Sequence, residues 1–75
     1  MDIRKVFGAN VRRYRLAAGI SQEAVAERMG VDRAFVSGIE RGLQIATLLT
    51  IWQTSQALGV RPADLLSENV PKVRS

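Results

Sequence analysis

Four glycines divide this chain into short helical segments and leave little choice of fold. Gly19, Gly30, Gly42 and Gly59 each follow apolar residues at helical spacing and precede a new helix-start signal. A left-handed residue that ends a helix is typically glycine, because other residues meet a side-chain clash in that conformation. The spacing therefore predicts four helices that end at these glycines, with a short fifth helix beyond the last one.

The helix-start signals agree with these ends. Asp2, Ser21 and Asp32 are good N-cap residues for the first three helices. The fourth helix is expected over roughly 47–58, and Pro62 suits the first turn of the fifth. Strand signals are lacking. The expected fold class is therefore all-α, a compact domain of five helices.

Apolar positions at helical spacing define the expected core. The inward residues are expected to be Phe7, Val11, Tyr14 and Ala18 in the first helix, Val25, Ala26 and Met29 in the second, Val36 and Ile39 in the third, and Leu48, Ile51, Ser55 and Leu58 in the fourth. Residues 1–69 are expected to form one domain, with 70–75 as a short flexible tail.

The chain lacks cysteine and histidine among its 75 residues. Disulfides, thiolate metal sites, the commonest general base and the commonest metal ligand are thereby excluded. No glycine-rich phosphate loop or spaced cluster of metal ligands appears. We therefore expect neither a metal nor another cofactor, and the residue inventory argues strongly against an enzyme.

The charge balance is basic, with 11 lysines and arginines against 7 acidic residues and a net charge of +4. The stretch "RKVFGANVRRYR" concentrates basic residues near the start of the chain. Such a balance favours nucleic acid or another anionic surface as partner, and an ordinary soluble surface is an equal alternative. No signal peptide or membrane-spanning stretch is visible, so a cytoplasmic location is expected.

Only "GVD" separates the second and third helices. A three-residue turn with glycine makes two short helices cross steeply, as in a helix-turn-helix. Here "SQEAVAERMGVDRAFVSGIERG", followed by "LGVRPADLL", resembles the DNA-binding domain of lambdoid phage repressors and Xre-type regulators. The resemblance covers about residues 7–66 and places the helix-turn-helix at about 21–41. The compact size and "DRAFVSGIERG" also resemble, more weakly, the controller proteins of restriction–modification systems.

The sequence departs from this family pattern near the fourth helix. Ala46 stands where the family commonly has a proline, and Thr54 and Ser55 replace the usual isoleucine and alanine.

The resemblance implies that the third helix lies in the major groove of double-stranded DNA. By position, the expected base-reading residues are Arg33, Ala34, Ser37 and Gly38. Arg33 can contact guanine O6 and N7 with two hydrogen bonds, and Ala34 can pack on a thymine methyl. Gly38 costs helix stability relative to alanine, and its missing side chain is expected to permit close approach to the groove.

Phosphate contacts are expected on both sides of this helix. The candidates are Ser21, Gln22, Arg41, Gln44 and Thr47, with Arg12 and Arg13 as weaker ones. Phe35 lies either in the core or against the sugar–phosphate wall, and the wall is favoured. In the family an arginine near the end of the first helix pairs with a glutamate near the end of the third. Arg15 and Glu40 occupy those positions and are expected to form a structural ion pair.

The fourth helix has more apolar surface than one core needs. Leu49 and Trp52 form an adjoining stripe that extends back to Ile45. We interpret the stripe as the interface of a homodimer that reads a pseudo-palindromic operator. The alternatives are that Trp52 belongs to the core, or that the stripe binds another protein, as in an interaction module or an antitoxin. No small-molecule effector is expected.

Overall fold

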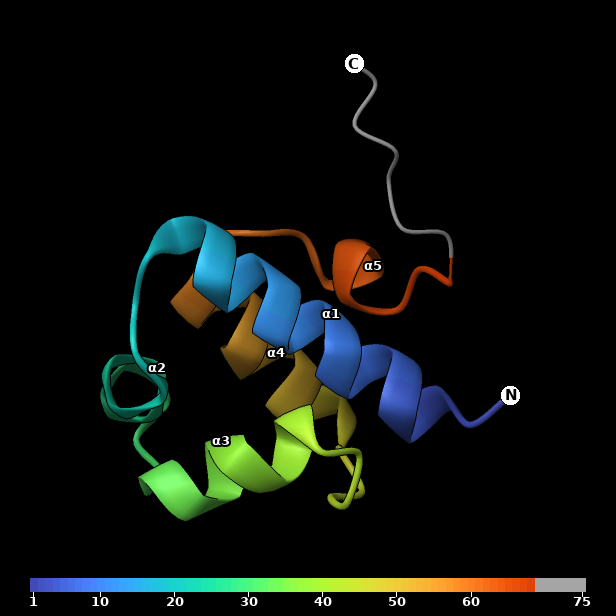
Figure 1. The fold of residues 1–75 in the computed structure, drawn as a ribbon, viewed down its shortest axis with the longest axis horizontal. Helices are drawn as coiled ribbons and strands as arrows, with labels where there is room; N and C mark the ends of the chain where they lie inside the picture. Colours follow the sequence, from blue (N-terminus) through green and yellow to red (C-terminus); the bar gives the residue numbers. More distant parts are fainter. Residues whose placement is uncertain (69–75) are drawn as a thin grey trace.

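Five helices follow one another along residues 1–68, the part of the chain that this computed structural model describes (Figure 1). They are α1 (Ile3–Ala18), α2 (Gln22–Met29), α3 (Arg33–Glu40), α4 (Leu48–Leu58) and α5 (Pro62–Leu65). The described residues contain no strand, so the all-α prediction is confirmed. The predicted tail, 70–75, and the last residue of the predicted domain lie outside the described part.

The predicted start and end signals act as caps. Each of the first four helices has an N-cap side chain that accepts a backbone N–H from its first turn. These N-caps are Asp2, Ser21, Asp32 and Thr47. The four punctuating glycines all have φ between 71° and 77°. Their left-handed conformation confirms the reason for which glycine was expected there.

The helices pack around a common core instead of forming layers. In Figure 1, α1 crosses the middle of the molecule with α4 behind it, and α3 and α5 lie on opposite sides. Helix α1 packs against α3, α4 and α5, while α2 packs against α3 and α4. Helix α3 is thus held from behind by α1 and α2.

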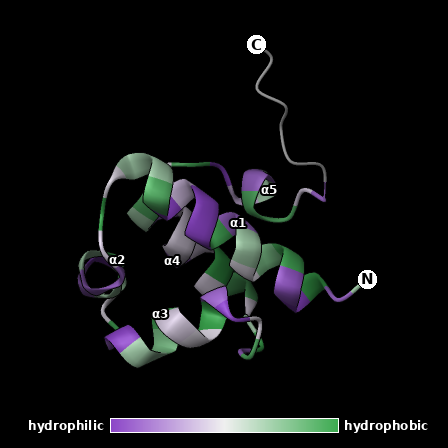
Figure 2. Ribbon diagram, in the orientation of Figure 1, coloured by the Kyte–Doolittle hydropathy of each residue, from purple (hydrophilic) through white to green (hydrophobic). Residues whose placement is uncertain are grey.

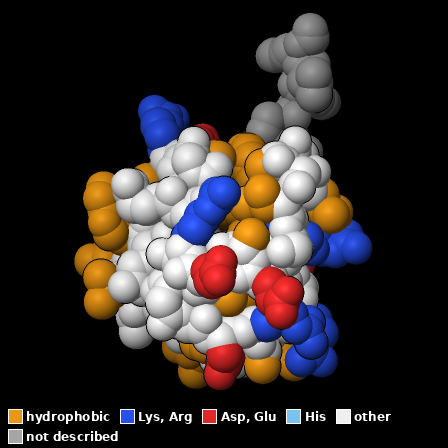
Figure 3. Space-filling view, turned by 90° about the vertical axis from the view of Figure 1, so that its left-hand side faces the viewer, with side chains coloured by type: hydrophobic (Ala, Val, Ile, Leu, Met, Phe, Trp, Pro, Cys, Tyr) orange, Lys and Arg blue, Asp and Glu red, His pale blue; other side chains and the backbone are white. Residues whose placement is uncertain are grey.

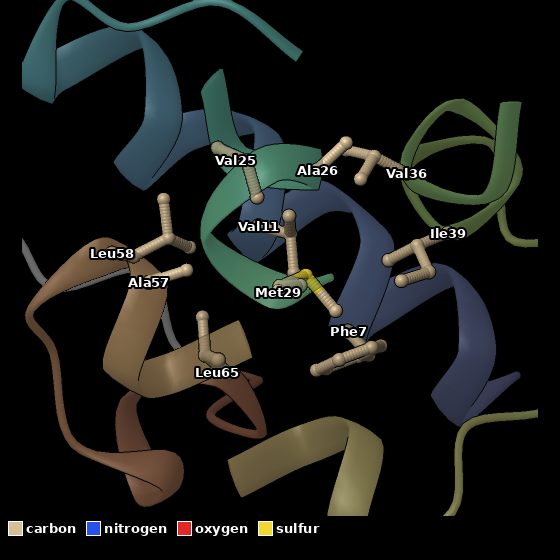
Figure 4. Close-up of a cluster of buried hydrophobic side chains, with 10 residues drawn as sticks. All are labelled: Phe7, Val11, Val25, Ala26, Met29, Val36, Ile39, Ala57, Leu58 and Leu65. Carbon is tan, nitrogen blue, oxygen red and sulfur yellow. The ribbon is translucent and has the colours of Figure 1, made fainter. Parts of the chain in front are cut away.

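Every helix contributes to one hydrophobic core (Figure 4). Its buried members are Phe7, Val11, Val25, Ala26, Met29, Val36, Ile39, Ala57, Leu58 and Leu65. Along α1, hydrophilic and hydrophobic residues are interspersed, as expected for a helix with one buried side (Figure 2). The inward assignments for α2 and α3 are confirmed.

The prediction that Leu48 and Ala18 lie in the core is wrong, and both residues lie at helix ends. Leu48, the first residue of α4, is 85% exposed, because α4 reaches the core through its C-terminal half. Ala18, the last residue of α1, is also exposed, because the chain turns away at Gly19 immediately after it. Tyr14 and Ile51 are half-buried and pack against the core.

The two unusual polar residues of α4 are fully buried and fully satisfied. The hydroxyl of Thr54 donates to the carbonyl of Thr50 at 2.7 Å, and that of Ser55 donates to the carbonyl of Trp52 at 2.7 Å. A buried hydroxyl without a partner would cost about 1–3 kcal/mol. Bonding back to the helix avoids this cost, so α4 tolerates the departure from the family pattern.

Candidate nucleic-acid interface

The turn between α2 and α3 fixes the direction of α3. Gly30 is left-handed, and the N–H groups of Gly30 and Val31 both donate to the carbonyl of Ala26. Asp32 then caps α3, its carboxylate accepting the Phe35 N–H at 3.0 Å. The chain therefore ends one helix and starts the next within three residues, which is the geometry of a helix-turn-helix.

Helix α3 has a core side and an outward side. Val36 and Ile39 are buried, whereas Arg33 and Ala34 are exposed and Ser37 is half-buried. Three of the four predicted base-reading residues thus share an accessible side of one helix. What they contact stays a prediction.

The prediction that Gly38 lies open to DNA is wrong. Gly38 is buried, because the side chain of Gln44 lies over it. A Cβ placed on Gly38 would be 2.9 Å from Gln44 Nε2 and 3.1 Å from its Cγ. Gly38 is therefore the contact surface for a glutamine from the following loop.

A second glycine, Gly8, sets how closely α1 and α3 approach. A Cβ on Gly8 would overlap the carbonyl oxygen of Ile39 and lie 3.0 Å from that of Glu40. Only a residue without a side chain lets the end of α3 lie this close to α1. This role was not predicted, although a glycine inside a helical pattern was a usable signal.

Arg15 and Glu40 form the predicted ion pair between α1 and α3. Arg15 Nε donates to Glu40 Oε2 at 2.7 Å, and its NH2 group donates to Oε1 at 3.1 Å. The Glu40 side chain is only 3% exposed. Its hydrogen bonds raise the pKa of Arg15 above the ordinary value. Removing one partner of a well-buried pair can cost about 3–5 kcal/mol, because the other charge is left unpaired.

The ion pair is connected to the exposed end of α3 through Gln22. Gln22 Nε2 donates to Glu40 Oε1 at 3.0 Å, and Gln22 Oε1 accepts a hydrogen bond from Arg33 NH1 at 2.9 Å. Gln22 was predicted to contact the DNA backbone, but in this structure both ends of its amide have internal partners. It links the Arg33 guanidinium to the buried Arg15–Glu40 pair.

The other predicted backbone-contacting residues surround α3. Ser21 is exposed and caps α2, its hydroxyl accepting the Ala24 N–H at 3.0 Å. Arg41 is exposed at the end of α3. Thr47 is exposed at the start of α4, where it caps that helix. Each of these positions can present a hydrogen-bond donor to a phosphate, and that contact stays a prediction.

The remaining candidates differ in how accessible they are. Phe35 is half-buried and packs against the core, and its contact with the sugar–phosphate wall stays a prediction. The Arg13 guanidinium donates to Asn10 Oδ1 at 2.8 Å and stacks over the Tyr14 ring. Arg12 is exposed.

The basic excess of the chain is not spread over every face. On the side nearest α2, acidic and basic side chains lie side by side (Figure 3). Helix α2 itself carries Glu23, Glu27 and Arg28. A DNA phosphate backbone would therefore meet mixed charge on that side.

A separate apolar surface lies at the start of α4. Leu48, Leu49, Ile51, Trp52 and Pro62 line one shallow depression. Trp52 is 54% exposed, so the alternative that it belongs to the core is wrong.

Ile45 is exposed as well, but it lies in the loop before α4. Because α4 begins only at Leu48, the predicted helical stripe does not extend back to Ile45.

Comparison with known proteins defines the family. The sequence matches the helix-turn-helix family over residues 11–65. The control protein C.BamHI of Bacillus amyloliquefaciens is 44% identical over 66 residues, covering 87% of this chain and 82% of that protein. An uncharacterized HTH-type transcriptional regulator of Sinorhizobium fredii, y4dJ, is 39% identical over 67 residues, covering 89% of this chain and 87% of that protein.

A solved structure agrees with the sequence matches. The restriction-modification controller protein C.AhdI from Aeromonas hydrophila superposes with a TM-score of 0.79 at 39% identity, covering 83% of this chain and 90% of that one. The fold and these relatives define the class of helix-turn-helix transcriptional regulators. The chain belongs to the helix-turn-helix family, and the finer resemblance to controller proteins is also confirmed.

The described residues add two further findings. Within 1–68, no helix combines the length and hydropathy that a membrane span requires. Over the same range, no group of three histidine, cysteine or acidic side chains could hold a metal ion.

Proposed function

We propose that this helix-turn-helix regulator binds a pseudo-palindromic DNA operator as a homodimer, with α3 in the major groove. The observation that carries the proposal is the placement of Arg33. It is exposed in the first turn of a helix whose other side is fixed in the core. Its guanidinium also donates to Gln22 Oε1 at 2.9 Å, which favours one orientation of the side chain.

The three outward residues of α3 can each make a simple contact with a base edge. Arg33 donates two hydrogen bonds to guanine O6 and N7, the commonest specific contact in the major groove. Ala34 offers a methyl group to thymine, and Ser37 offers a hydroxyl that can donate or accept. Ser21, Arg41 and Thr47 hold the helix in register through phosphates, with Phe35 against the sugar–phosphate wall. Gln22 can add only the second N–H of its amide, because the first donates to Glu40 and the oxygen accepts from Arg33.

The apolar surface at the start of α4 supports the homodimer. A large exposed apolar patch on a small protein marks an interaction site. Leu49, Trp52 and the adjacent loop residue Ile45 make self-complementary contacts across a two-fold axis. The two α3 helices then reach successive major grooves, with half-sites about 34–36 Å apart.

The same surface favours a second candidate function. An antitoxin-type regulator would use the apolar residues of α4 to bind a different protein and α3 to bind its operator. In either case the activity is binding without a catalytic step, and the protein acts on DNA in the cytoplasm.

Selection of bound sequences from a random DNA pool tests the proposal. We expect the wild-type protein to enrich a two-fold symmetric site that contains a guanine in each half. The Arg33→Ala variant is expected to lose the guanine preference, because the bidentate contact is worth about 1–3 kcal/mol. Both proteins should keep a steep salt dependence from the remaining phosphate contacts.

The Arg61→Ala variant is the matched control. Arg61 is exposed at the start of α5, on the opposite side of the molecule from α3 (Figure 1). The substitution removes one positive charge away from the proposed DNA interface, so sequence preference should be unchanged. Wild-type protein that enriches no sequence above generic polycation binding would refute the regulator proposal.

A further inference from the structure

The chain folds back onto α3 as soon as that helix ends. Gly42, with φ of +75°, lets its own N–H donate to the carbonyl of Ile39 at 3.0 Å. The next N–H, that of Leu43, donates to the carbonyl of Gly38 at 2.9 Å. This pair of bonds is the Schellman arrangement. It fixes the first loop residues against the middle of α3.

Gln44 follows directly and occupies the space that a side chain at Gly38 would take. Residue 38 lies one helical turn beyond Ala34, on the side of α3 that continues its exposed surface. The closest approach to a Cβ at this position would be 2.9 Å, to Gln44 Nε2. The outward side of α3 therefore carries, at this turn, an amide that belongs to the loop.

The amide of Gln44 has unused hydrogen-bonding capacity. Among the described residues it makes no hydrogen bond, and the side chain is half-buried. The amide of Gln22, the other glutamine beside α3, is bonded at both ends. Of these two amides, only that of Gln44 can donate and accept at the same time toward an external partner.

We infer that Gln44 is a specificity-determining residue that reads an adenine from the position left vacant by Gly38. The inference rests on the proposed binding of α3 in the major groove. A glutamine amide pairs with adenine by accepting from N6 and donating to N7. Gln44 thereby takes a base-reading role in place of the backbone contact expected from the sequence. Gly38 contributes because it has no side chain, which leaves room for the Gln44 amide.

Binding-site selection with four proteins tests this inference. These are the wild type, Gln44→Ala, Gly38→Ala and the double variant. The wild type should enrich adenine at one position in each half-site, and Gln44→Ala should weaken that preference by at least about five-fold. Preferences at the other positions and the salt dependence should stay unchanged, because glutamine carries no charge.

The Gly38→Ala variant probes the same amide without altering it. Its added methyl displaces Gln44, so the same adenine preference should weaken. The double variant should show no greater loss than Gln44→Ala alone, since both changes act on one contact. Gln56→Ala removes an exposed glutamine of α4 and should leave all preferences unchanged. Matching thermal unfolding curves establish that the variants are folded.

The outcomes separate this inference from the proposed function. A wild type that enriches an operator, together with a Gln44→Ala variant that keeps every base preference, overturns the role of Gln44 alone. A Gly38→Ala variant that shifts a different position from Gln44→Ala also overturns it. A wild type that enriches no sequence overturns both.

Discussion

Gly8 and Gly38 both lie inside helices, and each faces atoms of another segment where a side chain would be. At Gly8 those atoms are backbone carbonyls of α3, which cannot move without moving the helix. At Gly38 they are the end of the Gln44 side chain, which can rotate away. The two positions therefore offer a matched comparison of the same substitution.

We expect Gly8→Ala to destabilise the protein and Gly38→Ala to leave its stability nearly unchanged. Alanine gains about 0.5–1 kcal/mol over glycine from helix preference at either position. Overpacking against fixed backbone costs about 1–3 kcal/mol, and the overlap at Gly8 is severe enough for the cost to exceed the gain. Urea unfolding of both variants measures the difference. Equal stabilities would contradict the role assigned to Gly8 in the α1–α3 approach.

The network from Arg15 to Arg33 shows what could and could not be predicted at the level of residues. The Arg15–Glu40 pair was predicted from the family resemblance. The bonds that Gln22 makes to Glu40 and Arg33 were not. They depend on the crossing of α2 and α3, and the sequence carries no signal for side chains that meet only across such a crossing.

At the scale of elements, helix boundaries were predictable because their signals are local. A capping side chain and a left-handed glycine act within one turn of the chain, so the sequence alone reveals them. The burial of Leu48 and Ala18 was predicted wrongly, because helical spacing was extended to the ends of helices that leave the core there. The path of the loop over Gly38 depends on α3 and the loop together, and no local pattern predicts it.

The end of α3 gives a prediction at this scale. Gly42 and Gly59 are both left-handed, but Lys5 Cγ would lie 2.8 Å from a Cβ on Gly42, whereas a Cβ on Gly59 would have open space. An alanine in this conformation costs about 1–2 kcal/mol from backbone strain alone. We therefore expect Gly42→Ala to lower the free energy of unfolding by more than Gly59→Ala does.

DNA binding should separate the same two variants further. Gly42→Ala loosens the loop that brings Gln44 to α3, so its operator affinity should fall at a temperature where both proteins are folded. Gly59→Ala changes the end of α4 and should bind normally. A fluorescence anisotropy titration with operator DNA measures both. Equal affinities would mean that the loop conformation does not matter for recognition.

At the scale of the whole molecule, several apolar side chains stay exposed that the core of a single chain does not bury. All five helices share one core, yet Leu49 remains 62% exposed at the start of α4, and Trp52 and Leu48 beside it are also exposed. Burying such side chains between two copies stabilises the association by about 25 cal/mol per Å² of apolar area removed from water. A small domain with one modest core gains most from such an interface.

We expect Trp52→Asp to dissociate the proposed homodimer into monomers that stay folded. The charge would be buried without a partner in the dimer but remains solvated in the monomer, because the tryptophan lies outside the core. Leu16→Asp is the matched control. Leu16 is 52% exposed near the C-terminal end of α1 and lies outside the apolar surface at the start of α4. Sedimentation equilibrium gives the masses, and circular dichroism establishes folding.

Loss of the proposed dimer should also weaken binding to the full operator, and this effect can be separated from that of the added charge. A monomer reads one half-site, so Trp52→Asp should bind the full operator with the affinity of a single half and without the gain that linked sites provide. Leu16→Asp adds the same negative charge and should keep the full gain. A folded Trp52→Asp protein with wild-type mass would show that the surface at the start of α4 does not form the homodimer.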